Sequence, residues 1–538
     1  MDFDTDSRTR VKTGGLVVAH TLYELGVDTI YSVSGNQVMS VFDAAKDFDL
    51  RIIHMRHESA AAYAAGVSAE LTEVPGVALV TAGPGFLAAT LGVATIKSME
   101  LPLLFLSGAS ATSDAGAGGF QDLDQTSVAL VTCKATMRVT SVKDIRKTLI
   151  EAWRLAQSSI PGPVHVSLPS DVLLAEAPDV LSIERQPPAA DSAFRDESVL
   201  HGMALRLMEA KRPFIIARQS AGRGAAGRAL HILARQLGTT AFISESPRGL
   251  NDLKYREIVR RLGDSDCLLA VAPADFAVGF LAEPVIAPSC KVLQIDAPGD
   301  PQPRHPAELH TQVAPNLALS YLAKATVSHA PRLPMRGQLE AFPQSTEIFS
   351  LSSKDGLHPL EVARLVRGLL EPDDVVILDG GEFCQWIRLG LRDIPNRMVW
   401  NSKLGGIGGS IPMAVGIASA SHRGRTIIFV GDGSFGYHGS EFETATRNAL
   451  PIVAIVGNDR RWGAEWHLQV SRYGGDRTYE TELSGARYDQ VASGFGALGF
   501  NTTDSASFQE ALRVSLGRSQ PACLNVQILS LQSPAVAP

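Results

Sequence analysis

Cysteine is scarce in this sequence, and no long hydrophobic run is uninterrupted. The 538 residues include five cysteines, which lie far apart and form no Cys-x-x-Cys pair. An odd number of dispersed cysteines argues against a disulfide framework and a zinc site, and it favours a reducing compartment, so we expect a cytoplasmic protein. The two most apolar stretches, 77–96 and 267–290, are broken by Gly, Pro, Asp or Glu, and neither is expected to span a membrane. The acidic and polar residues 1–6 do not resemble a secretory signal.

Basic runs are also missing, and the overall charge is moderate. The formal net charge is -7 and charged residues make up 20% of the chain, which argues against nucleic acid as the main partner. A hydrophobic fraction of 45% is ordinary for a globular protein and excludes a disordered or fibrous chain. Because one compact domain rarely exceeds about 300 residues, a chain of this length is expected to contain several domains.

Two proline-containing stretches, 184–191 and 327–344, have the composition of linkers. They predict an N-terminal domain over 1–183, a central domain over 192–326 and a C-terminal domain over 350–538, all of ordinary domain size.

Short apolar runs alternate with helical stretches along the chain. Residues 14–25 have helical periodicity, with Gly26 as a stop. Continuous apolar runs are typical of buried parallel strands; they occur at 29–33, 77–81, 101–106, 164–168, 213–217, 268–271, 291–295, 375–378, 426–430, 452–456 and 523–528. The alternation predicts an α/β protein of three doubly wound parallel-sheet domains, with no close internal repeat. In such sheets ligands bind at the carboxyl ends of the strands.

One of these strand ends carries candidate metal and phosphate ligands. The run at 426–430 leads directly into Gly-Asp-Gly-Ser, where Asp432 could hold Mg²⁺ and Ser434 could cap a phosphate. The next strand ends in Gly-Asn-Asp, which places Asp459 at the neighbouring strand end, and the backbone carbonyl of Arg461 is a further candidate oxygen ligand. Taken alone, Gly-Asp-Gly is also compatible with an ordinary tight turn.

Gly-Asp-Gly followed at this distance by Asn-Asn is the signature of thiamine-diphosphate (ThDP) enzymes, and the chain resembles the acetolactate synthase group of that superfamily over nearly its whole length. The resemblance implies a ThDP- and Mg²⁺-dependent carboligase or lyase that acts on 2-oxo acids through a ylid and an enamine. It also implies that Gly433 and Ser434 contact the diphosphate, and that Asp432, Asp459 and Arg461 hold the metal. The chain departs from the family pattern at Asp459, where the second Asn is usual, and this carboxylate adds negative charge beside the diphosphate.

The run Arg-His-Glu-Ser-Ala-Ala around Glu58 matches the Arg-His-Glu-x-x-Ala pattern of the family. By resemblance, Glu58 hydrogen-bonds the pyrimidine ring of ThDP and so helps to form the ylid, since a carboxylate in an apolar environment can share a proton with a ring nitrogen. A partner of the helix dipole is the alternative. The family places this glutamate and the diphosphate site in different subunits, which implies a homodimer or a dimer of dimers, that is, a homotetramer.

Three loops resemble further cofactor contacts of the family. Ile407 would force the cofactor into a bent shape, and the Gly405 carbonyl would bond the pyrimidine. Glu382, after another strand, is expected to contact the diphosphate, and Gly83 and Pro84 form a Gly-Pro-Gly turn near the active site. Each of these segments could instead be only a turn or a loop.

Three polar residues are candidates for the substrate side. Gln121 matches a substrate-lining residue of acetolactate synthases, and Gln37, where benzaldehyde lyase carries a histidine, can only hydrogen-bond. Glu465 could protonate a carbanion and would favour decarboxylation or cleavage over ligation. A surface loop or a solvated helix charge is the alternative for these positions.

Three functions stay open at this point. The first is an acetolactate synthase-like enzyme with a small 2-oxo acid as substrate. The second is a 2-hydroxyacyl-CoA lyase or an oxalyl-CoA decarboxylase with an acyl-CoA substrate; residues 133–145 resemble the latter, but Phe120-Gln121 replaces its Tyr-Glu. The third is a non-catalytic nucleotide-binding homologue.

The central segment lacks the glycine-rich turn that FAD-binding relatives carry, and has 215–222 in its place. Residues 244–250 resemble a second nucleotide loop, and Asp296 could hold a ribose hydroxyl. FAD, an adenine nucleotide or no ligand therefore all stay open for this segment.

Overall fold

The computed structural model describes residues 12–177, 197–244, 262–272, 286–300, 306–327, 355–392, 394–401, 403–420 and 423–534. The described residues belong to two compact units. The first unit comprises Met1–Lys97, Leu101–Ser158 and Gly162–Ala189, and the second comprises Ser98–Glu100, Ser159–Pro161 and Ala190–Pro538. The predicted linkers at 184–191 and 327–344 lie outside the described residues, apart from Val327, and the three domain boundaries stay a prediction.

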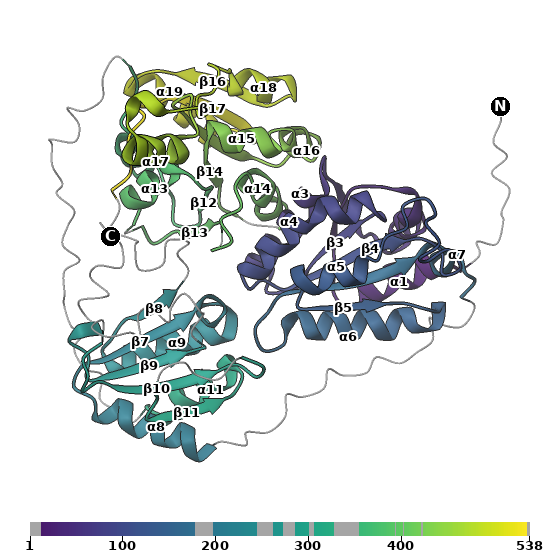
Figure 1. Cartoon of the computed structure of the whole chain (residues 1–538), viewed down its shortest axis with the longest axis horizontal. Coiled ribbons are helices and arrows are strands. Elements are labelled where there is room, and N and C mark those ends of the chain that lie inside the picture. Colours follow the sequence, from purple (N-terminus) through teal and green to yellow (C-terminus); the bar gives the residue numbers. More distant parts are fainter. Residues whose placement is uncertain are drawn as a thin grey trace. The chain divides into compact units, whose positions relative to one another are not determined.

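Three parallel sheets, each flanked by helices, make this an α/β protein, as predicted (Figure 1). Among the described residues, every helix is too short or too polar to span a lipid bilayer.

The N-terminal sheet, in the first unit, has the strand order β2-β1-β3-β4-β6-β5. Its strands are β1 (Thr29–Ser32), β2 (Arg51–His54), β3 (Gly76–Val80), β4 (Leu103–Ala109), β5 (Ala135–Arg138) and β6 (Pro163–Pro169). Its helices are α1 (Gly14–Glu24), α2 (Met39–Ala45), α3 (Glu58–Thr72), α4 (Pro84–Ser98), α5 (Gln125–Thr132), α6 (Ile145–Gln157) and α7 (Ser170–Leu174). The alanine-rich α3 is buried along its length because small side chains allow close packing.

The middle sheet, in the second unit, has the order β11-β10-β9-β7-β8. Its strands are β7 (Pro213–Arg218), β8 (Ala241–Ser244), β9 (Cys267–Val271), β10 (Lys291–Asp296) and β11 (Leu309–Gln312). The described helices beside it are α8 (Glu197–Glu209), α9 (Gly224–Leu237) and α11 (Pro315–Ala325).

The C-terminal sheet, also in the second unit, has the order β13-β12-β14-β15-β17-β16. Its strands are β12 (Val375–Leu378), β13 (Arg397–Trp400), β14 (Thr426–Gly431), β15 (Ile452–Asn458), β16 (Leu498–Thr502) and β17 (Ala522–Gln527). Its helices are α12 (Pro359–Arg367), α13 (Glu382–Gly390), α14 (Ser410–Ser419), α15 (Asp432–His438), α16 (Glu441–Arg447), α17 (Gly463–Tyr473), α18 (Tyr488–Gly494) and α19 (Ser505–Leu516).

The N-terminal and C-terminal sheets share one topology. If the strands of each are numbered along the chain, both run in the order second, first, third, fourth, sixth, fifth. The order therefore reverses between β1 and β3 in one sheet and between β12 and β14 in the other. Such a switch point opens a crevice at the carboxyl ends of the strands, where ligands bind in doubly wound folds. Both switch points are therefore expected to carry functional residues.

Candidate functional site

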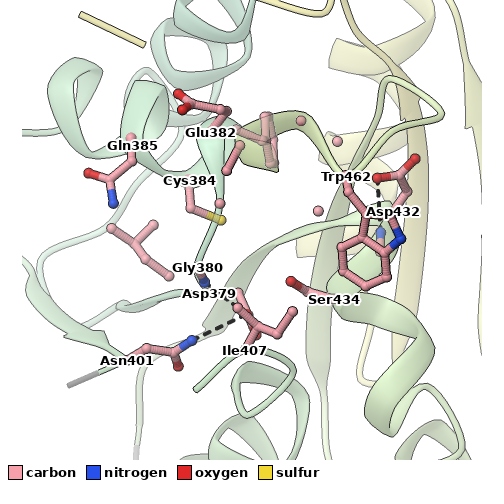
Figure 2. Close-up of a pocket in the computed structure, with 18 of the residues that line it drawn as sticks. Asp379, Gly380, Glu382, Cys384, Gln385, Asn401, Ile407, Asp432, Ser434 and Trp462 are labelled. Carbon is pink, nitrogen blue, oxygen red and sulfur yellow. Dashed lines mark hydrogen bonds between the residues drawn. The ribbon is translucent and has the colours of Figure 1, made fainter. Parts of the chain in front are cut away.

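A cavity of about 280 Å³ opens at the carboxyl edge of the C-terminal sheet (Figure 2). We call it the C-terminal cavity. The loops after β12, β14 and β15 line it, so it lies at the predicted switch point. Nine residues selected from the sequence lie together on its wall: Glu382, Gly405, Ile407, Asp432, Gly433, Ser434, Asp459, Arg461 and Glu465.

Asp432 and Asp459 lie at the ends of neighbouring strands, since the register pairs Gly431 of β14 with Gly457 of β15. Oδ1 of Asp432 accepts a hydrogen bond of 2.9 Å from the Gly433 amide. Its Oδ2 is buried and has no hydrogen-bond partner among the described residues. An unsatisfied buried oxygen of this kind is costly unless a ligand completes it.

The two carboxylates influence each other electrostatically. Burial raises the pKa of Asp432 to about 7, and the charge of Asp459 adds to the rise. Burial also raises the pKa of Asp459, although the Ser530 hydroxyl, which donates to Asp459 Oδ2 over 2.8 Å, opposes that rise. Two carboxylates on the wall of one cavity are the type of oxygen donor that a hard divalent cation prefers.

Glycines leave the cavity wall open. A Cβ atom at Gly381, Gly405 or Gly431 would meet no atom within 4 Å. The backbone at these positions is therefore not covered by other side chains and is accessible to a ligand. Gly433 differs, because a Cβ there would lie 2.6 Å from the Trp462 ring. The indole therefore packs on the Gly433 backbone, and Figure 2 shows it beside Asp432.

Asp379 stabilises the loop that contains Ile407 through hydrogen bonds. Its carboxylate is buried and accepts backbone N–H bonds from Gly408 at 2.9 Å and Ser410 at 3.1 Å, and a side-chain bond from Asn401 at 3.3 Å. His438 lies close to the same loop, with its Nδ1 2.6 Å from the Gly408 carbonyl oxygen. Asp379 directly follows β12, and this position at a strand end was the signal that the sequence offered for it.

Replacing Asp379 with asparagine is expected to lower the free energy of unfolding by about 1–3 kcal/mol, because one acceptor oxygen becomes an NH₂ group facing a backbone N–H. It is also expected to weaken cofactor binding, since the loop holding Ile407 loses its anchor. Urea unfolding and ligand titration measure the two effects.

Asp374 offers a matched control at the opposite end of β12. It is buried and paired with Arg425 at 2.6 Å, but it does not line the C-terminal cavity. Asp374→Asn should therefore destabilise the fold and leave cofactor affinity unchanged. Equal cofactor affinities for the two variants would contradict a role of Asp379 at the cavity.

Glu382 lines the C-terminal cavity, and its carboxylate is bonded to the last described residues. The Ser533 amide donates to Glu382 Oε2 over 2.8 Å, and Trp386 Nε1 donates to the Leu531 carbonyl over 3.0 Å. The Glu382 carboxylate is thus held by the chain's own backbone. If Glu382 contacts a diphosphate, the amide at the start of α13 is the chemically suitable group, because its side chain is an acid.

Arg461 and Glu465 also line the C-terminal cavity. The Arg461 guanidinium lies 4.4 Å from the centre of the Trp466 ring and 3.6 Å from a carboxylate oxygen of Glu482. The side chain is thus engaged elsewhere, and the predicted metal ligand is the backbone carbonyl of Arg461. Glu465 is exposed in the first turn of α17. An exposed carboxylate at a cavity mouth can exchange protons with a ligand.

The remaining five predicted residues lie in the first unit, around the switch point of the N-terminal sheet. Glu58 is the first residue of α3, and a Cβ at Gly85 would lie 3.4 Å from its Oε1. No hydrogen bond or ion pair to the Glu58 carboxylate is made by any residue that the structure describes. The carboxylate is therefore available to a ligand rather than committed to the fold.

Gln37, Gln121, Gly83 and Pro84 surround the same strand ends. Gln37 Nε2 donates to Gln121 Oε1 over 2.8 Å. Gly83 packs against Gln121, because a Cβ atom added to this glycine would lie 3.0 Å from the Gln121 Cβ. The buried Gln125 holds the turn: its Oε1 accepts from the Gly83 amide at 2.8 Å. Sequence reasoning missed Gln125, because its partner lies 42 positions away.

At the carboxyl edge of the middle sheet, both oxygens of Asp296 already have partners. Gln294 Nε2 lies 2.9 Å from Oδ1, and His310 Nε2 lies 2.8 Å from Oδ2. Arg218, in the segment without a glycine-rich turn, pairs with Asp300 at 3.2 Å. The ribose contact expected of Asp296 would have to displace these bonds. Of the candidate second loop, only Ser244 lies within the described residues.

Comparison with known proteins gives two matches to family models. Residues 12–128 match "Thiamine pyrophosphate enzyme, N-terminal TPP binding domain", and residues 379–526 match the C-terminal TPP binding domain of the same enzymes.

Among curated relatives, acetolactate synthase large subunit of Mycobacterium tuberculosis is 27% identical, over 97% of this chain and 96% of the relative. 2-Hydroxyacyl-CoA lyase 2 of Caenorhabditis elegans is also 27% identical, over 98% and 91%. The solved thiamine diphosphate-dependent 4-hydroxybenzoylformate decarboxylase of Rhodococcus jostii shares the fold, with a TM-score of 0.77 at 21% identity, over 96% of this chain and 99% of that one.

The chain therefore belongs to the thiamine-diphosphate-dependent enzymes, as its sequence motifs indicated. Within them it falls in the group of acetolactate synthases and 2-hydroxyacyl-CoA lyases, and it is a ThDP-dependent carboligase or lyase.

The residues present fit the cofactor of this family. The unpartnered Oδ2 of Asp432 and the carboxylate of Asp459 supply oxygen donors for a cation, and the bare backbone at Gly381 and Gly431 leaves space for a diphosphate.

Proposed function

We propose that the protein is an acetolactate synthase-like enzyme that uses ThDP and Mg²⁺ to act on small 2-oxo acids. The observation that carries the proposal is the buried, unpartnered Oδ2 of Asp432 beside Asp459, on a wall of bare glycine backbone. Asp432, Asp459 and the Arg461 carbonyl would hold Mg²⁺, and Gly433 and Ser434 would contact the diphosphate.

When bound, ThDP supplies a carbon nucleophile that adds to a carbonyl and accepts the electron pair of a breaking C–C bond. Glu58 would hold a proton at the pyrimidine ring. Ile407, which packs against Gly380, would support the bent cofactor, and the Gly405 carbonyl would orient its pyrimidine. Glu382 would contact the diphosphate through its backbone.

The substrate side would be formed by Gln37 and Gln121, and Gly83 and Pro84 would contact the cofactor. Both glutamines are neutral and can hydrogen-bond without a proton transfer, which suits the orientation of a 2-oxo acid. Condensation of 2-oxo acids is redox-neutral, so this function needs no flavin chemistry from the central domain.

A CoA-dependent lyase of the 2-hydroxyacyl-CoA type is the second candidate. The observation that favours it is Glu465, which lines the C-terminal cavity and is exposed. A carboxylic acid in this position could protonate a carbanion after cleavage, whereas ligation requires that the carbanion attack a second carbonyl instead.

We also propose that two or four copies of the chain form the active enzyme in the cytoplasm. Glu58 and the C-terminal cavity belong to different units, and a second copy could bring such a pair together, as in the family that the sequence resembles. The five cysteines are all free thiols in the structure, which suits a reducing compartment.

Acetolactate formation from pyruvate tests this function. The purified chain with ThDP and Mg²⁺ is expected to form acetolactate and CO₂, and omission of ThDP should abolish both. If ThDP binds but pyruvate stays untouched, the synthase proposal is wrong, and cleavage of a 2-hydroxyacyl-CoA becomes the next assay.

A further inference from the structure

Three polar side chains in the first unit form a directed hydrogen-bond chain. Thr81 Oγ1 donates to Gln37 Oε1 over 2.5 Å, and Gln37 Nε2 donates to Gln121 Oε1 over 2.8 Å. Thr81 and Gln37 are buried, with 8% and 9% of their surface exposed. They follow β3 and β1, the two strands between which the order of the N-terminal sheet reverses.

The polarity of this chain is set at its buried end. A threonine hydroxyl can donate or accept, but Gln37 Oε1 is the one partner of Thr81 Oγ1 among the described residues. The hydroxyl proton is therefore satisfied only when the carbonyl oxygen of Gln37 faces Thr81 and its NH₂ group faces Gln121. The oxygen of Gln121 then accepts, and its NH₂ group is turned away from Gln37. No residue among those the structure describes accepts a hydrogen bond from Gln121 Nε2, so two N–H donors are left for a ligand.

Glycine contacts hold the buried members of the chain in place. A Cβ at Gly108 would lie 2.7 Å from the Gln37 Cβ, and a Cβ at Gly35 would overlap the Thr81 side chain. Neither side chain can move toward these backbones, so packing holds the two partners of this hydrogen bond in place.

The backbone at Gln121 is also constrained. Its φ of 58° lies in the left-handed region, which a non-glycine residue keeps only where its surroundings impose it. The next residue, Asp122, accepts hydrogen bonds from Ser110 at 2.9 Å and from the amides of Gly116 and Gly118 at 2.8 and 3.1 Å. These bonds fix the loop that presents the Gln121 amide.

The hydrogen-bond chain of Thr81, Gln37 and Gln121 lies beside Glu58. A Cβ at Gly85 would lie 2.7 Å from Thr81 Cγ2 and 3.4 Å from Glu58 Oε1, so one glycine touches both groups. The N–H donors of Gln121 therefore belong to the same strand-end region as the carboxylate proposed to act on the cofactor.

We propose that Thr81 and Gln37 are positioning residues that make Gln121 a hydrogen-bond donor to the carboxylate of a 2-oxo acid. The inference rests on the proposed function and deepens it, because it names the substrate group that the site selects. An amide N–H bond to a carboxylate is charge-assisted, and its loss is expected to weaken substrate binding about 10- to 100-fold.

The test compares Thr81→Val, which removes the hydroxyl donor at nearly constant volume, with Thr81→Ser, which keeps it. Without the donor, the Gln37 amide can rotate and allow Gln121 to present its oxygen. Thr81→Val is expected to raise KM for pyruvate at least about 10-fold with kcat within about 3-fold of wild type, and Thr81→Ser is expected to behave as wild type.

Gln37→Glu gives a second variant of the same shape, in case Thr81→Val folds poorly. A glutamate there accepts from Thr81 but cannot donate to Gln121, so the Gln121 amide should turn and KM for pyruvate should rise as in Thr81→Val. ThDP affinity is measured alongside and is expected to stay unchanged for every variant that folds.

The outcomes separate the inference from the function beneath it. If the wild-type protein turns over pyruvate but KM is unchanged in Thr81→Val and Gln37→Glu, only the positioning role is overturned. A fall in kcat without a rise in KM also overturns it. No turnover of pyruvate or another 2-oxo acid by wild type overturns the proposed function, and the inference with it.

Discussion

Replacing Glu58 with glutamine is expected to reduce turnover of any substrate about 100- to 10,000-fold, the range over which a single proton-transfer group acts. Glutamine keeps the size and a hydrogen-bonding tip, but it cannot share a proton with a ring nitrogen. The free energy of unfolding should change little, because no described residue forms a hydrogen bond or an ion pair with the Glu58 carboxylate. Its interaction with the dipole of α3 contributes at most about 1 kcal/mol.

The experiment measures turnover, ThDP affinity and deuterium exchange at the reactive carbon of the bound cofactor. Glu58→Gln should bind ThDP, unfold at the wild-type temperature and exchange that proton far more slowly. Glu70→Gln, a partly buried glutamate on the same helix, is the matched control and should leave turnover, ThDP affinity and deuterium exchange unchanged. Wild-type turnover in Glu58→Gln would remove this residue from the mechanism and leave the helix-dipole interpretation.

The strands that could be predicted from the sequence are the buried ones. Every apolar run marked as a strand is one, from β1 at Thr29–Ser32 to β17 at Ala522–Gln527. The strands that were not delimited are the two edge strands of each sheet: β2, β5, β8, β11, β13 and β16. An edge strand has fewer neighbours, so its side chains are only partly buried, and β5 has no fully buried residue at all. A pattern of continuous hydrophobicity cannot find such a strand.

The shared topology of the N-terminal and C-terminal sheets was not visible in the sequence either. No internal repeat is apparent, because a sheet constrains only which positions are apolar, and many sequences satisfy that pattern. The candidate site was more predictable, since strand-end motifs such as Gly-Asp-Gly are local and nine chosen residues lie on one cavity.

Contacts between distant positions were the part that sequence reasoning missed. Asp379 reaches the loop at Gly408 across 29 positions, and Ser530 reaches Asp459 across 71. Only the fold brings these partners together, because neither pair follows a helical or strand period. Ser530 also bears on the one departure from the family pattern, since it gives the extra carboxylate at position 459 a hydrogen-bond donor.

Asp432→Asn and Asp459→Asn are expected to have opposite consequences, although both remove one negative charge from the same cavity wall. Asp432 carries the buried oxygen without a partner, so its amide variant should bind Mg²⁺ and ThDP at least about 100-fold more weakly, as the loss of a charged metal ligand implies. Asp459→Asn restores the oxygen ligand usual in the family and removes a charge beside the diphosphate. Its affinity for ThDP should equal or exceed that of wild type.

Binding can be followed without turnover, because the Trp462 indole packs on Gly433 inside the cavity and its fluorescence should respond to ThDP with Mg²⁺. Neither substitution should destabilise the ligand-free protein, since each relieves repulsion between two buried carboxylates. A weakened ThDP affinity is therefore attributable to the lost ligand rather than to unfolding. If Asp459→Asn lost ThDP as completely as Asp432→Asn, the extra carboxylate would be an essential ligand of this enzyme. The charge balance of its metal site would then differ from that of the family that it resembles.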